Sequence, residues 1–156
     1  MGLDMYLTAS KYISAWNSDN KSELATFKKI VNASCPGASK FINQGSPSGR
    51  VEFNIGYWRK ANSIHNWFVY NIQDGVDECR SYDVDIIALE RLRDECRKSI
   101  ESKQILLKPK AGFFFGSVEI DEWYWQDMKN TIIIIDKCIK LKDLDPAWDF
   151  KYRSSW

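Results

Sequence analysis

The stretch VEFNIGYWRKANSIHNWFVYNIQ, residues 51–73, contains both kinds of secondary structure that the fold needs. Its first five residues alternate apolar and polar side chains, which predicts a strand over Val51–Ile55 with one face buried. From Tyr57 to about Gln73, apolar residues recur at the spacing of a helical stripe. They are Ala61, Ile64, Phe68 and Ile72. We therefore expect a helix from Tyr57 onward, ended by the turn-forming pair Asp74 and Gly75.

Further elements lie on both sides of this stretch. Alternating patterns predict strands near Leu3–Ala9 and at Ala147–Tyr152. Helical spacing predicts three more helices, at residues 21–33, 85–102 and about 121–141. The run Ile132–Ile135 is β-branched and could form a buried strand, but its place inside a long helical pattern favours a helix. The expected order is strand, helix, strand, three helices and strand.

This order predicts a single α+β domain over residues 1–156. We expect a small, mostly antiparallel sheet, joined by both terminal strands and packed against about three to four helices. The chain is long enough for a substantial core, and its hydrophobic fraction of 44% is ordinary for a globular protein.

Charge and cysteine usage exclude several classes of function. The net charge is +1, so nothing favours binding to duplex nucleic acid or to an anionic membrane surface. No apolar stretch approaches membrane-spanning length, and the first residues lack the pattern of a signal peptide. The four cysteines form no Cys-x-x-Cys pair, which argues against a zinc knuckle or a redox motif. We expect reduced thiols in a cytoplasm.

One dense group of aromatic, amide and basic residues surrounds the only histidine, His65. On the expected helix, Trp58, Asn62 and His65 would form one rim of a cleft, where an indole can stack on a flat ring. Arg59 and Lys60 at the helix start could bind a phosphate together with the free N–H groups of the first turn. The alternative is a histidine at the edge of the core, bonded to a backbone carbonyl, with both cations solvated.

A second dense group begins with GFFFGS, residues 112–117. Three consecutive phenylalanines cannot all point the same way, so at least one must be exposed or covered by another part of the chain. Phe113 and Phe115 could form an apolar pocket wall, while Gly116 and Ser117 let the backbone approach a ligand. The alternative is a hydrophobic plug between helices.

Acidic residues follow directly after this segment. Asp121 is a natural N-cap, and Glu122 in the first turn complements the helix dipole. We count Trp123 and Asp127 among the candidate ligand-binding residues. The sequence predicts no cofactor, although clustered carboxylates including Glu119 could hold Mg²⁺. The spacing of these acids matches no established metal loop.

Common catalytic motifs are absent from the sequence. A single histidine rules out paired-histidine phosphoesterase and zinc protease motifs, and the chain contains no phosphate-binding P-loop. It also contains neither a dinucleotide-binding glycine fingerprint nor a Gly-x-Ser-x-Gly nucleophile elbow. An enzyme would have to use His65 with Glu119 or Asp121 as its catalytic residues.

Four segments together resemble a family of small, mostly uncharacterised proteins from bacteriophages and bacteria. These are the start MGLDMYL, the motif YWRKANxIHxWF, the motif GFFFGSxExDEWYW and the ending FxYxSSW. The resemblance covers nearly the whole chain, except that residues 17–50 look like a variable insertion. Some members carry the label phosphoglycerate kinase, a larger two-domain enzyme whose nucleotide-binding features do not occur here. The resemblance implies a phage or mobile-element origin but assigns no catalytic residue.

Three hypotheses of function follow. The first is a phage protein in the host bacterial cytoplasm that binds a nucleotide-like or phosphorylated ligand without converting it, as a counter-defence sponge. The second is a small phosphoester hydrolase that uses His65 with carboxylates. The third is an inhibitor that binds another protein through exposed aromatic residues. If the aromatic excess is not all core, we also expect a homo-oligomer.

Overall fold

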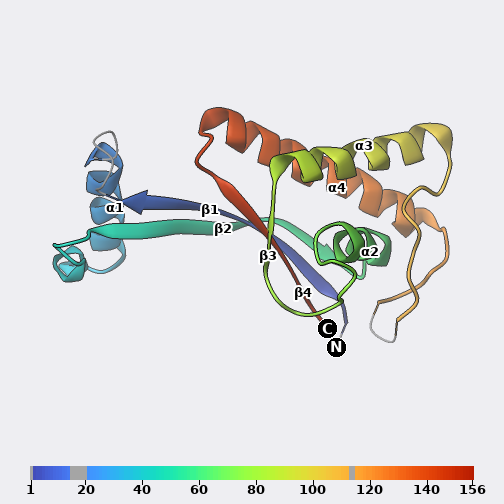
Figure 1. The fold of residues 1–156 in the computed structure, drawn as a ribbon, viewed down its shortest axis with the longest axis horizontal. Helices are drawn as coiled ribbons and strands as arrows, with labels where there is room; N and C mark the ends of the chain where they lie inside the picture. The colour runs from blue at the N-terminus through green and yellow to red at the C-terminus, as the bar shows by residue number, and fades with distance from the viewer. Residues whose placement is uncertain (1, 15–20, 113–114) are drawn as a thin grey trace. The chain divides into compact units, whose positions relative to one another are not determined.

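The computed structural model describes residues 2–14, 21–112 and 115–156 (Figure 1). These residues form a small antiparallel sheet of four strands together with four helices, which confirms the predicted α+β class. The elements in chain order are β1 (Asp4–Ser14), α1 (Lys21–Ser34), the 3₁₀ helix η2 (Ala38–Phe41), β2 (Ser48–Arg59), α2 (Asn62–Asn71), β3 (Tyr82–Val84), α3 (Ile86–Ser102), α4 (Glu122–Leu144) and β4 (Asp149–Ser155).

The chain divides into two compact units. The second unit, Ser10–Glu52, contains α1, η2 and the adjoining ends of β1 and β2. In this unit the ring of Phe27 packs closely on Gly49. A Cβ atom added to Gly49 would lie 2.1 Å from the Phe27 ring. The predicted helix at 21–33 is confirmed as α1, whereas the strand expected over Val51–Ile55 is longer, since β2 begins at Ser48.

The first unit, residues 1–9 and 53–156, contains the other helices and most of the sheet. The strand order is β2-β1-β4-β3, so both terminal strands join the sheet, as predicted, and they are neighbours in it. The strand β3 pairs with β4 in antiparallel register, with Tyr82 opposite Tyr152 and Val84 opposite Phe150. The strand β3 is not predicted from the sequence, because a strand of three residues is too short to show an alternating pattern.

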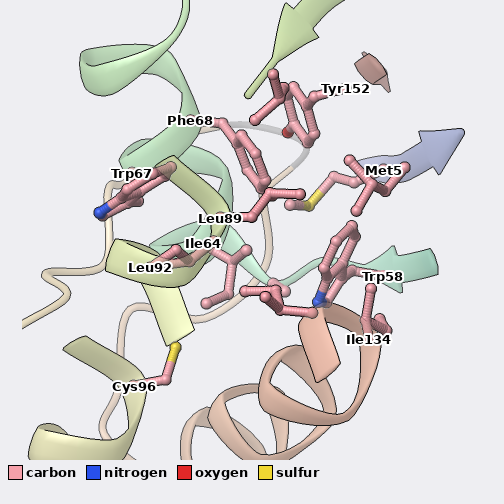
Figure 2. Close-up of a cluster of buried hydrophobic side chains, with 14 of the residues drawn as sticks. Met5, Trp58, Ile64, Trp67, Phe68, Leu89, Leu92, Cys96, Ile134 and Tyr152 are labelled. Carbon is pink, nitrogen blue, oxygen red and sulfur yellow. The ribbon is translucent and has the colours of Figure 1, made fainter. Parts of the chain in front are cut away.

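The core of the first unit lies between the sheet and the helices α2, α3 and α4 (Figure 2). β1 contributes its alternate residues Met5, Leu7 and Ala9, and Leu3 directly precedes the strand; all four are fully buried. The rings of Phe68 and Tyr152 stack at 3.8 Å. α4 packs tightly on β2, since a Cβ atom at Gly56 would lie 2.5 Å from Ile134.

Two of the core helices begin at aspartate caps, of which the cap of α4 is the predicted Asp121. The Asp85 side chain accepts the backbone N–H of Ala88 at the start of α3, and Asp121 caps α4. The run Ile132–Ile135 lies within α4, so it is helical and does not form the alternative buried strand. None of the described helices combines the length and apolar character needed to cross a membrane.

The predicted helix start at Tyr57 is wrong. Residues 57–59 continue β2, and α2 begins only at Asn62. From this strand Trp58 points into the core, where its Nε1–H donates to the Thr131 hydroxyl at 2.9 Å. Burial of the indole therefore holds this segment in the extended conformation, although its apolar residues also fit a helical stripe.

Candidate ligand-binding site

A cavity of about 330 Å³ lies in the first unit. Most of its wall comes from two segments, residues 59–63 at the junction of β2 and α2 and residues 116–127 around the start of α4. These are parts of the two dense groups in the sequence. The volume is at the small end of the range for small-molecule sites.

The junction between β2 and α2 is a tight double turn. The backbone of Lys60 is left-handed, with φ 59°, and its N–H donates to the Leu3 carbonyl at 2.8 Å. Ala61 follows with φ −76° and ψ 69°, and the Asn62 N–H donates to the Lys60 carbonyl at 2.9 Å, which is an inverse γ-turn. This turn places both Arg59 and Lys60 at the cavity, directly before the helix.

A second turn packs against the first. Gly116 has φ 88°, and a Cβ atom on it would lie 3.2 Å from the Cβ atom of Lys60. The Asn62 side chain fastens the same loop, because its Nδ2 group donates to the carbonyls of Phe115 at 3.3 Å and Ser117 at 2.6 Å. Asn62 therefore fixes the wall of the cavity across 55 residues of sequence.

Part of the cavity wall has a positive character. Asn62 and Ser63 in the first turn of α2 line it beside Arg59 and Lys60. The N-cap residue, Ala61, gives the helix no side-chain hydrogen bond. The first-turn N–H groups carry the partial positive charge of a helix start, which adds to the two cations.

Three acids, Glu119, Asp121 and Asp127, also line the cavity. The Oδ1 atom of Asp121 accepts the backbone N–H groups of Trp123 at 2.9 Å and Tyr124 at 3.1 Å. Burial, and secondarily the nearby Asp121, raise the pKa of Asp127 to about 6. Among the described residues, no side chain or backbone group bonds to the Asp127 carboxylate. This carboxylate thus faces the cavity without a partner.

Aromatic side chains complete the wall. Trp123 lines the cavity and is 75% exposed, so an indole face is open to a ligand. Tyr124 is buried and donates its hydroxyl to the Leu107 carbonyl at 2.9 Å. Six predicted ligand-binding residues therefore meet at this cavity: Arg59, Lys60, Asn62, Ser117, Trp123 and Asp127.

Trp58 and Phe115, predicted as ligand-binding, are instead core residues. Trp58 is buried, but it acts on the site through a chain of bonds, since the Thr131 hydroxyl that accepts its N–H donates to the Asp127 carbonyl at 2.7 Å. Phe115 is buried with its ring edge on His65, at 5.0 Å between centroids. Phe113 lies outside the described residues.

His65 is fully buried and does not line the cavity. Its Nδ1 atom lies 2.7 Å from the Tyr152 hydroxyl, and its Nε2 atom lies 3.0 Å from Oδ1 of Asp77. Burial lowers the pKa of His65 more than Asp77 raises it, so the ring is neutral. Tyr152 then donates to Nδ1, and Nε2–H donates to Asp77. The histidine is part of the core, but its partners are side chains rather than the expected backbone carbonyl.

The cavity is also lined by Ser63, Pro109 and Tyr124, which are not predicted from the sequence as site residues. No local pattern marks them, because their place at the cavity depends on tertiary packing. In the described parts of the chain, no three His, Cys, Asp or Glu side chains are grouped so that they could hold a metal ion.

No family profile, curated protein or solved structure matches this chain. Its fold and site define a small α+β protein with a cavity lined by two cations, three carboxylates and an exposed indole.

Proposed function

We propose that this protein binds a small phosphorylated ligand of the nucleotide type in the cavity and releases it unchanged. The observation that carries the proposal is that Arg59, Lys60 and the uncapped start of α2 line the same cavity as the exposed Trp123. A nucleotide has the matching pair of features, an anionic phosphate and a flat aromatic base.

The phosphate would bind beside Arg59 and Lys60. The guanidinium group of Arg59 can donate two parallel hydrogen bonds to phosphate oxygens, and Lys60 adds a second positive charge. Backbone N–H groups at the start of a helix are a common phosphate-binding arrangement. Here both cations directly precede the helix, so all three sources of positive potential act on one group.

The base would lie against Trp123. Stacking on an aromatic side chain contributes about 1–3 kcal/mol per base and needs an open ring face. The exposure of Trp123 is unusual for so large an apolar side chain, and its indole can provide that face. Covering the indole with a ligand would remove it from water.

Binding without turnover fits the site better than hydrolysis through His65. Both ring nitrogens of His65 are engaged by Tyr152 and Asp77, away from the cavity. Glu119 and Asp121, its proposed partners in catalysis, line the cavity without it. In the setting that the resemblance implies, a phage protein in the host cytoplasm, such binding would sequester a nucleotide signal. The four free thiols suit a reducing compartment.

Calorimetric titration with 3′,5′-cyclic mononucleotides tests this proposal. The variant Arg59→Gln should weaken binding at least about tenfold, since it removes a charge-assisted contact. Arg50→Gln is the matched control, because Arg50 is exposed on the same strand but belongs to the other unit. Equal loss in both variants, or no binding by the native protein, contradicts the proposal. Mass spectrometry of the recovered ligand shows whether it returns intact.

A further inference from the structure

The Asp127 carboxylate is a group of the cavity whose role the fold does not account for. It lines the cavity from the second turn of α4, and no described residue bonds to it. We propose that Asp127 selects a base with two adjacent N–H donors, the pattern of guanine, by accepting both of them. This inference rests on the proposed function, because it names the base of the bound nucleotide.

Asp127 is the acid of the cavity that is best placed for this contact. Asp121 already uses Oδ1 to cap α4, and Glu119 is exposed. Asp127 is held in place through its backbone, whose carbonyl accepts the Thr131 hydroxyl that in turn accepts Trp58. The backbone at Asp127 is therefore anchored, and its carboxylate lines the cavity without a bond to any described residue.

The chemistry of an ionised carboxylate restricts the base. Its two oxygens accept hydrogen bonds and donate none, so it favours ligands that offer paired donors, as a guanidinium group does. Guanine offers N1–H and its 2-amino group side by side. Adenine and cytosine offer only an amino group beside a ring acceptor, and uracil offers one N–H between two carbonyl oxygens. Only guanine satisfies both carboxylate oxygens without placing an acceptor against them.

The electrostatics of the site support the same contact. Burial and the charge of Asp121 raise the pKa of Asp127, so ionisation of this group is unfavourable in the empty cavity. A pair of donors would offset part of that cost. Arg59 and Lys60, which line the same cavity, would at the same time hold the phosphate.

The test compares 3′,5′-cyclic GMP with 3′,5′-cyclic IMP, which lacks only the 2-amino group, by calorimetric titration near pH 7.5. We expect the guanine nucleotide to bind at least about tenfold tighter, since a hydrogen bond to a charged group is lost with the inosine nucleotide. Asp127→Asn should abolish that preference. Asp143→Asn, the same change on an exposed aspartate of α4 that does not line the cavity, should leave it unchanged.

The outcomes separate this inference from the proposed function. Equal affinity for the two nucleotides overturns the role of Asp127 but leaves nucleotide binding intact. A preference that persists in Asp127→Asn also overturns it. Absence of binding for every cyclic nucleotide overturns both proposals. The comparison of two ligands on the native protein decides the matter even if the Asp127 variant does not fold.

Discussion

At the scale of single residues, two buried ionisable groups show how the same protein treats charge in opposite ways. His65 is neutral and fully bonded within the core. Asp127 lines the cavity, and its partial burial disfavours the ionised form of its carboxyl group. The first arrangement stabilises the fold, whereas the second costs stability at neutral pH, which is the behaviour expected of a binding residue.

Replacing Asp127 should therefore stabilise the protein. Its pKa rises from 3.8 to about 6 on folding, so its contribution to stability is fully present below about pH 3.8 and is lost as the pH rises through about 6. Asp127→Asn should raise the free energy of unfolding near pH 7.5 by about 1–2 kcal/mol, less than the full shift gives because the group is partly open to solvent. Near pH 4 the gain should vanish. Urea denaturation at both pH values measures this, and destabilisation at pH 7.5 would contradict the account.

His65 should produce the opposite pH dependence. Because folding lowers its pKa below the ordinary 6.5, its contribution to stability is complete above pH 6.5 and is lost as the pH falls from 6.5 toward the lowered value. His65→Gln should cost about 2–3 kcal/mol near pH 7.5, where two buried hydrogen bonds are disturbed. The difference between native and variant proteins should shrink toward pH 5. A difference that stays constant over this range would show that the histidine does not titrate on unfolding as described.

At the scale of secondary-structure elements, the long periodic segments could be predicted from sequence and the junctions could not. The helices α3 and α4 follow from their apolar spacing and their aspartate caps. The segment 57–61 was assigned to the wrong element because Trp58 fits both a strand and a helical stripe, and only its burial decides between them. The sequence marked both segments of the site, but their meeting depends on contacts such as that of Asn62 with Ser117.

Gly116 packs against the junction between β2 and α2, so substituting it tests the role of this contact in the cavity wall. Gly116→Ala should cost about 1–2 kcal/mol of stability, because an alanine is strained at φ 88° and its Cβ atom presses on Lys60. It should also weaken cyclic nucleotide binding by displacing the Lys60 turn. Gly75→Ala is the matched control, since Gly75 also has positive φ, at 79°, but nothing lies within 4 Å of the added atom. Chemical denaturation and calorimetric titration measure both effects, and equal loss of affinity in the two variants would contradict this role.

At the scale of the whole molecule, a net charge of only +1 conceals an uneven local distribution. Two cations, the start of α2 and three carboxylates line the same cavity. The composition predicts no bulk attraction for polyanions, and it cannot reveal a small site that gathers charges of both signs. That grouping appears only after the chain has folded.

The pH dependence of ligand binding should consequently come from Asp127 alone. A cyclic phosphodiester does not titrate between pH 5 and 8, so any change in affinity over that range must come from the protein. If the ionised form of Asp127 accepts the base, the affinity for 3′,5′-cyclic GMP should fall about tenfold per pH unit below about pH 6. The affinity of Asp127→Asn should be flat over the same range. An identical fall in the variant would assign the effect to another group.

The most direct test of the central claim is to locate the bound nucleotide by NMR. Titration of ¹⁵N-labelled protein with 3′,5′-cyclic GMP should shift the backbone amides of Ser63 and Ile64 in the first turn of α2 and the indole N–H of Trp123. Coincident changes at these positions are the predicted result. An unchanged spectrum would contradict the claim, as would shifts confined to the groove beside Tyr70 and Asn71.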